Sequence, residues 1–273
     1  MSECCITFPG PVSRSTICHL VIDYLKYVLY YRGQFPLPLE QMKQSLGRNS
    51  NSHNPQSSIS HQIYNDDPDE RKNSQSFLPL KISSKDMRKK QLFVETVITF
   101  DKFFDNLSRT LQNENVLEVV LNLGANMMRP KELYRVTLPL KCSNPECKQD
   151  YASLQRCRIH FFKDILQSSL WEDLTADSTL PISILLLLGP GVSLSEYMEQ
   201  KCFYAVPKHC KQRTIRFPCS TCGHCSESLS EDGRMVDSLV DSKDSTLRTR
   251  GTGLWVKMKS NLRGFKHIEE VNQ

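Results

Sequence analysis

The sequence predicts an α+β protein, and three observations support this class. Two long segments repeat apolar residues at steps of three and four, as amphipathic helices do. Short β-branched runs bounded by glycine or proline are typical of strands. The two kinds of element do not alternate along the chain, as they would in a repeating βαβ fold.

The first predicted helix follows Ser13 or Thr16, either of which can cap its N-terminus. Its apolar positions run at helical spacing from Ile17 to Tyr31. Gly33 then stands where helices commonly end in the left-handed conformation. Residues 35–39 (FPLPL) are expected to be extended, because proline does not continue a helix.

Two further helices are predicted from apolar stripes. The second begins after Ser83 or Ser84, and its stripe consists of Phe93, Val97, Phe100, Phe104, Leu107 and Leu111. The third covers about 154–174, and its inward side is expected to consist of Cys157, Phe161, Phe162, Ile165, Leu166 and Leu170. Residues 48–84 lie before the second helix, are polar and have no apolar period. A disordered loop is therefore predicted there.

Strands are expected where β-branched or alternating apolar residues lie between turn residues. The segments are 116–121 (followed by Gly124), 134–140, 182–188, 203–206, 214–217 and 254–258. Residues 223–251 form a second polar segment, for which we also expect a disordered loop. The two loops account for much of the low hydrophobic content of 39%.

Composition excludes several classes of protein. The 273 residues carry a formal net charge of +5, which is small for a dedicated nucleic-acid binder. The longest apolar run, 182–188, is too short to cross a bilayer, which needs about 20 residues. Residues 1–11 have no secretory signal pattern. We expect a soluble protein of the cytosol or nucleus, with neither a membrane nor a nucleic acid as its partner.

Eleven cysteines are the unusual feature of the composition. Cys142 and Cys147 form one closely spaced pair, and Cys219 and Cys222 form a second. Two such pairs can bind zinc tetrahedrally if the fold brings them together. The long separation of the pairs favours reduced thiols instead, so we expect no metal and no cofactor. A zinc-stabilised protein that binds nucleic acid is the alternative function.

Signatures of catalysis are missing from the sequence. It has no glycine-rich phosphate-binding loop, no nucleophile elbow and no His-Glu-x-x-His motif. Cys157 and His160 lie one helical turn apart, but a core thiol and a solvated imidazole are the simpler interpretation. We predict that the protein is not an enzyme.

Several segments together resemble the comet family, whose members bind the spindle-checkpoint HORMA protein Mad-two. They are FPGPVS at 8–13, LPLEQMK at 37–43, DKFF at 101–104, GAN at 124–126, PKELY at 130–134, YAVP at 204–207, Trp255, and GF at 264–265. Their order and spacing carry the resemblance, which leaves out only the two polar loops.

The resemblance implies a HORMA-like fold. In such a fold three helices pack on a mainly antiparallel sheet, and a C-terminal segment wraps the sheet edge like a safety belt. A single domain over residues 8–265 is implied, interrupted by the loops 48–84 and 223–251. The family is not catalytic, in agreement with the absence of catalytic motifs.

The resemblance also implies a function. The protein would be an adaptor that binds the closed conformer of Mad-two and presents it to a HORMA-remodelling AAA+ ATPase, silencing the mitotic checkpoint. Such a protein would be found in the nucleus and cytoplasm, and on the spindle during mitosis. The family's binding surface maps to Tyr31 and Arg32 at the end of the first helix and to Phe162, Leu166 and Trp171 around the third. A bulky aromatic anchor of this kind is typical of interface hot spots.

Overall fold

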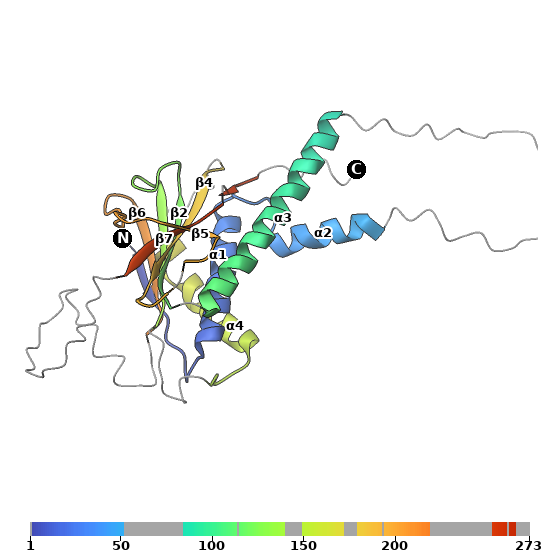
Figure 1. Cartoon of the computed structure of the whole chain (residues 1–273). Coiled ribbons are helices and arrows are strands. Elements are labelled where there is room, and N and C mark those ends of the chain that lie inside the picture. Colours follow the sequence, from blue (N-terminus) through green and yellow to red (C-terminus); the bar gives the residue numbers. More distant parts are fainter. Residues whose placement is uncertain are drawn as a thin grey trace, which may run out of the picture.

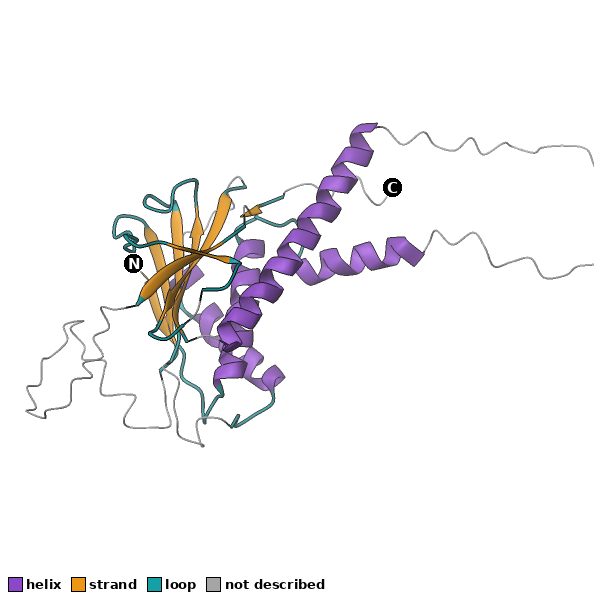
Figure 2. Ribbon diagram, in the orientation of Figure 1, coloured by secondary structure: helices purple, strands orange, loops and turns teal. Residues whose placement is uncertain are grey.

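The computed structural model describes residues 2–51, 84–113, 115–139, 149–171, 179–192, 194–218, 253–260 and 262–265. Its elements are β1 (Ser2–Cys5), α1 (Arg14–Tyr31), α2 (Leu39–Asn51), α3 (Ser84–Asn113), β2 (Val116–Leu123), β3 (Glu132–Thr137), α4 (Leu154–Gln167), the 3-10 turn η2 (Ser169–Trp171), β4 (Pro181–Leu188), β5 (Met198–Gln200), β6 (Lys211–Arg216), β7 (Leu254–Met258) and β8 (Leu262–Arg263). The helices lie on one side of a twisted sheet (Figure 1, Figure 2). The predicted α+β class is confirmed.

The strands form one sheet in the order β1-β6-β3-β2-β4-β7-β5, with β8 beside β4. Strand β2 is central and pairs antiparallel with both β3 and β4. The outer pairs of β7 with β4 and β5 are also antiparallel, whereas β6 runs parallel to both β1 and β3. The sheet is therefore mostly antiparallel, as predicted.

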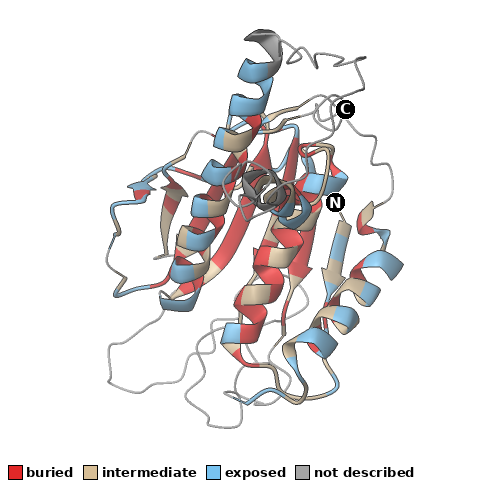
Figure 3. Ribbon diagram, turned by 90° about the vertical axis from the view of Figure 1, so that its right-hand side faces the viewer, coloured by how far each residue is buried: buried red, intermediate tan, exposed pale blue. Residues whose placement is uncertain are grey.

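Helix α1 lies against the middle of the sheet, with α3 on one side and α4 on the other (Figure 3). Ser13 caps its N-terminus, because the Ser13 hydroxyl accepts a hydrogen bond from the Thr16 backbone N–H. Asp150 completes this cap by accepting a hydrogen bond from the Ser13 backbone N–H at 2.6 Å. Gly33 has φ of 62°, which confirms the left-handed end predicted for this helix.

The core fills the space between the helices and the sheet. All six residues of the stripe predicted for the second helix are buried on α3. Adjacent strand residues point to opposite faces, so Val119 and Leu121 join this core whereas Val120 belongs to a second, smaller cluster with Tyr204. That second cluster lies on the face of the sheet away from the helices.

Helix α2 corrects three expectations at once. The described part of the chain contains four α-helices rather than three, and α2 begins directly after Pro38 instead of following an extended segment. Proline is well tolerated at a helix start, where its missing N–H needs no partner. Residues 48–51, expected in the first disordered loop, belong to α2. The remainder of that loop up to residue 83, and the loop 223–251, lie outside the described residues.

Two strand assignments also differ from the prediction. Residues 203–206 form no strand, because Tyr204 packs its ring against Trp255 on the sheet (ring centres 4.9 Å apart) and the backbone does not join a ladder. The strand in this region is β5, slightly earlier in the chain. Strand β1 was not predicted, and together with the buried Ile6 it shows that the folded part begins before the expected boundary at residue 8.

The last two described strands both pair with β4. Strand β7 pairs with the second half of β4, and β8 pairs with its first two residues. After β8, the Phe265 backbone N–H donates a hydrogen bond to the Gln34 carbonyl oxygen at 2.7 Å. The Phe265 ring then packs against Phe93 of α3. Residues far apart in the sequence are thereby joined at the end of α1.

Gly264→Ala is expected to loosen this junction. A Cβ at position 264 would lie 2.7 Å from the Gln34 carbonyl oxygen and 2.9 Å from the Gln34 Cα. Because these are backbone atoms, relief requires a backbone shift that costs about 1–3 kcal/mol. Thermal unfolding should show the lower stability, and amide exchange at Phe265 should be faster. An unchanged exchange rate at Phe265 would contradict this account.

Candidate partner-binding surface

Four aromatic rings gather where α1 meets α4 and η2. We call Tyr27, Tyr31, Phe162 and Trp171 the aromatic cluster. The Tyr27 ring lies 5.8 Å from that of Tyr31, 5.5 Å from Phe162 and 5.2 Å from Trp171, measured between ring centres. Tyr31 and Trp171 are closer still, at 4.8 Å. These separations fall in the range in which aromatic pairs attract one another.

Helical spacing explains how α1 supplies its part of the cluster. Tyr27 and Tyr31 lie four residues apart and so face the same direction. Tyr24, one turn earlier, is fully buried and contacts both Phe161 and Trp171 at ring separations of 6.3 and 6.4 Å. The tyrosines of α1 thus lead from the core to the surface.

Helix α4 presents two neighbouring phenylalanines in different directions. Phe161 is fully buried, whereas Phe162 is half-buried and joins the aromatic cluster. Leu166, one turn further, was expected to face inward but is 58% exposed. The inward stripe of this helix is narrower than predicted, since its buried residues are Cys157, Phe161 and Ile165. Leu166 therefore lies on the surface as an apolar extension of the cluster.

Trp171 is held at the end of η2, directly after α4. Its indole is partly buried against the tyrosines of α1, and within the described residues its buried Nε1 has no hydrogen-bond partner. Tyr31 beside it is 41% exposed. The pair thus combines a fixed aromatic base with a solvent-facing ring, which suits an anchor for a protein partner.

Ion pairs join α1 to its neighbouring helices. The Arg158 Nε of α4 lies 2.6 Å from the Asp23 carboxylate of α1, and the Lys26 Nζ lies 2.7 Å from the Glu40 carboxylate of α2. The hydrogen bond from Lys26 holds the pKa of Glu40 below its usual value. Burial raises the pKa of Tyr27, with smaller contributions from neighbouring tyrosines, so this hydroxyl remains neutral at physiological pH.

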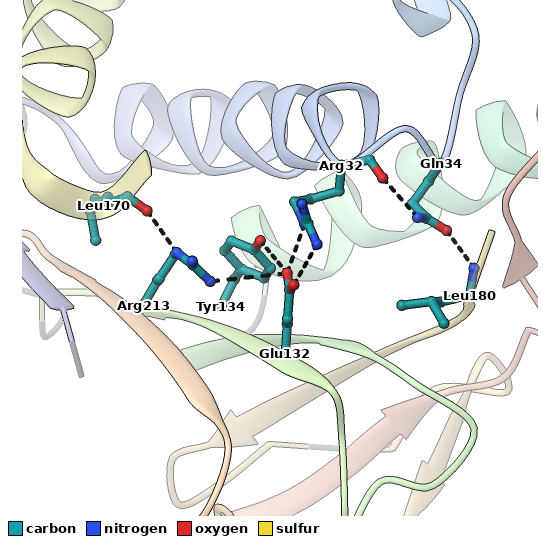
Figure 4. A network of polar contacts seen from close by, with 7 residues as sticks. All are labelled: Arg32, Gln34, Glu132, Tyr134, Leu170, Leu180 and Arg213. Atoms are coloured by element: carbon teal, nitrogen blue, oxygen red, sulfur yellow. Dashed lines mark hydrogen bonds and ion pairs between the residues drawn. The ribbon is translucent and has the colours of Figure 1, made fainter. Parts of the chain in front are cut away.

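Arg32 does not lie on this surface, which corrects its assignment as a contact residue. The side chain is 2% exposed and points into the molecule, where its Nε donates a hydrogen bond to the Glu132 carboxylate at 2.8 Å (Figure 4). A second contact joins the other end of the guanidinium to the same carboxylate. Both groups are charged and buried, so the pairing satisfies them mutually.

The structure brings four of the five predicted residues to one surface: Tyr31, Phe162, Leu166 and Trp171. Two further members of this surface were missed. Tyr27 is not part of the apolar stripe predicted for the first helix, although its position four residues before Tyr31 places it on the same side of that helix. Ile159, which is 62% exposed, follows the spacing of Phe162 and Leu166 along α4. An apolar residue on the solvent-facing side of an amphipathic helix could have predicted that Ile159 belongs to a binding surface.

The described residues offer no second kind of site. Cys142, Cys147, Cys219 and Cys222 lie outside them, and within them no cluster of three or more His, Cys, Asp or Glu could hold a metal ion. Burial raises the pKa of the Cys157 thiol, which disfavours the reactive thiolate. His160 is not simply solvated, since its Nε2 lies 2.9 Å from the Thr7 carbonyl oxygen. Among the helices described, none has the length and apolar character needed to cross a membrane.

Comparisons with known proteins identify the family of this chain. A family model described as "p31comet: Mad1 and Cdc20-bound-Mad2 binding" matches residues 2–237. The human MAD2L1-binding protein is 26% identical over 215 residues, which is 78% of this chain and 69% of the relative. The mouse MAD2L1-binding protein is 24% identical over 214 residues, or 78% and 68% of the two chains. Because the family model spans most of the sequence, this chain belongs to the p31comet family, as its resemblance to comet proteins predicted.

Proposed function

We propose that this protein is an adaptor that binds the closed conformer of Mad2 through the aromatic cluster and Leu166. Mad2 is the HORMA protein called Mad-two above. It then presents the complex to an AAA+ ATPase that remodels HORMA proteins, and so silences the mitotic checkpoint. It acts in the nucleus and cytoplasm, and on the spindle during mitosis. The family is described as binding Mad2 that is held by Mad1 or Cdc20. Both relatives are named as binding proteins, not as enzymes.

The observation that carries the proposal is the aromatic cluster itself. A rigid group of rings is flanked by the exposed apolar side chains of Leu166 and Ile159 on α4 and by the Asp23–Arg158 ion pair between α1 and α4. An aromatic centre with a polar rim is the usual anatomy of a specific protein interface. We expect an interface of ordinary size, about 1,600 Å² in total.

The proposal includes a HORMA-like fold with a safety-belt-like C-terminal segment. The α+β arrangement supports the first part, since the helices cover one face of a mostly antiparallel sheet. The path of residues 254–265 along β4 and over to α1 and α3 supports the second. We propose one domain that includes residues 8–265 and begins with β1.

Trp171→Ala is expected to weaken capture of Mad2 by roughly 30-fold or more, because truncating an aromatic anchor typically costs about 2 kcal/mol or more. The measurement is a pull-down with Mad2 locked closed and, separately, Mad2 locked open. The wild-type chain should retain the closed form alone. Trp255→Ala is the matched control, because Trp255 packs on Tyr204 at the opposite face of the sheet.

Two results would reject the proposal. Equal capture of both Mad2 conformers would exclude recognition of the closed form, and equal weakening by Trp171→Ala and Trp255→Ala would exclude the α1–α4 surface. Thermal unfolding of each variant separates lost binding from lost folding. Addition of the ATPase and ATP to the complex with closed Mad2 tests presentation, for which we expect conversion of Mad2 that depends on the adaptor.

A further inference from the structure

A buried network of polar contacts links the sheet to the elements that carry the aromatic cluster (Figure 4). Glu132, at the start of β3, is 3% exposed. Its carboxylate accepts hydrogen bonds from Arg32 and, at 2.7 Å, from the Tyr134 hydroxyl. The Arg213 guanidinium of β6 lies 4.0 Å from the same carboxylate and 5.5 Å from the centre of the Tyr134 ring. The network therefore centres on one carboxylate inside the molecule.

The same network reaches the backbone on both sides of the cluster. The Arg213 Nε donates a hydrogen bond to the Leu170 carbonyl oxygen at 2.6 Å, and Leu170 directly precedes Trp171. Arg32 directly follows Tyr31. The two arginines that face the Glu132 carboxylate therefore lie next to Tyr31 and Trp171, the two rings of the cluster that are closest together. Arg32 is adjacent to Tyr31 in the sequence, and Arg213 is hydrogen-bonded to the residue before Trp171.

We propose that Arg213 and Glu132 are positioning residues for the partner-binding surface, which fix from inside where Trp171 stands relative to Tyr31. This inference rests on the proposed binding function. A hydrogen bond from a charged donor to a buried carbonyl is strong and directional, and inside the protein no water replaces it. An anchor that is held in its bound position before association loses less entropy on binding. Affinity for the partner is therefore set in part by residues that never touch it.

The test is a double-mutant cycle of Arg213→Met with Trp171→Ala, read as the dissociation constant for Mad2 locked closed. Arg213→Met removes the guanidinium and keeps a side chain of similar reach. We expect a loss of about tenfold in the wild-type background and of less than about twofold when Trp171 is already alanine, because a positioning residue acts through the ring that it positions. Equal losses in both backgrounds would overturn the proposal.

Arg135→Met is the matched control for this cycle. Arg135 lies in β3 and pairs with Glu118 at an Nε–Oε1 distance of 2.6 Å, on the sheet face away from the helices. We expect it to change affinity by less than about twofold in both backgrounds, and a loss as large as that of Arg213→Met would contradict the proposal. Arg213→Lys keeps the positive charge without the guanidinium fork and replaces the methionine variant if that one does not fold.

A second measurement needs no partner. In a chain with Trp255→Phe, Trp171 is the only tryptophan, because the sequence has two. We expect Arg213→Met to shift the Trp171 fluorescence toward that of a solvent-exposed indole while circular dichroism shows the same folded chain. Unchanged fluorescence would overturn the positioning role. Failure of the wild-type chain to bind Mad2 would instead overturn the proposed function and leave this result standing.

Discussion

Replacing Glu132 by glutamine is expected to lower the free energy of unfolding by about 3–5 kcal/mol, the usual cost of breaking a buried ion pair. The change removes the negative charge that faces Arg32 and Arg213, whose side chains are 2% and 6% exposed. Glutamine is nearly the same size, so packing is conserved and the loss reports electrostatics. Urea denaturation at neutral pH measures it as a lower midpoint with an unchanged slope.

Glu118→Gln is the control for this prediction. Glu118 also pairs with one arginine of the sheet, but the Arg135 side chain is 25% exposed, so water solvates the charge that is left behind. We expect a loss of about 1 kcal/mol or less for this variant. Equal losses in the free energy of unfolding for the two variants would show that the buried Glu132 network stabilises the protein no more than the Glu118–Arg135 pair does.

Alkaline pH is expected to destabilise the protein steeply. Burial raises the pKa of Tyr204 to about 12 and raises the pKa values of Tyr24 and Tyr134 as well, with the Glu132 charge adding to the shift of Tyr134. An exposed tyrosine has a pKa near 10, so above this pH the unfolded chain loses protons that the folded chain keeps. The contribution of these tyrosines to the free energy of unfolding is fully present below about pH 10. Above it, the free energy of unfolding falls by about 4 kcal/mol per pH unit if all three tyrosines contribute.

Tyr204→Phe provides the matched variant for the alkaline prediction. Within the described residues the Tyr204 hydroxyl has no hydrogen-bond partner, so its removal should leave stability at pH 7 nearly unchanged. Between about pH 10 and 12 the variant should lose stability less steeply than the wild type, by about 1.4 kcal/mol per pH unit. Urea midpoints measured across this range test the difference. Parallel curves for the two chains would contradict the assignment.

Local signals predicted much of the fold. Ser13 as the cap of α1, Gly33 as its end and the apolar stripe of α3 were all readable from the sequence, because each depends on residues within one or two turns. The strands β2, β3, β4 and β7 were also predicted, since their apolar residues lie between clear turn residues. The prediction of a surface that includes Tyr31 and Trp171 came from family resemblance and not from periodicity.

The features that were missed depend on contacts distant in sequence. The polar second half of α2 gives little sign of a helix, but Met42 and Leu39 at its start pack into the core. Strand β1 has only four residues and forms because its backbone pairs with that of β6, which is distant in the sequence. Arg32 follows an exposed tyrosine, so its position in the sequence predicts a surface residue, whereas in the structure its side chain is paired with the buried Glu132. A sequence alone does not show which acid will meet a given arginine.

The parallel pairing of β1 with β6 has a consequence for how the chain folds. Ser2 pairs with Arg213 and Cys5 with Arg216, so this ladder joins segments that lie more than 200 residues apart in the sequence. Strand β6 in turn needs β3 as its inner neighbour. Contacts between such distant segments form late, because closing a long loop costs entropy before the ladder repays it. Until β1 docks, β6 is an open sheet edge on which other unfolded chains can assemble. Strand β1 is thus among the last to join the sheet, and its docking replaces the six-residue edge of β6 with an edge of only four residues.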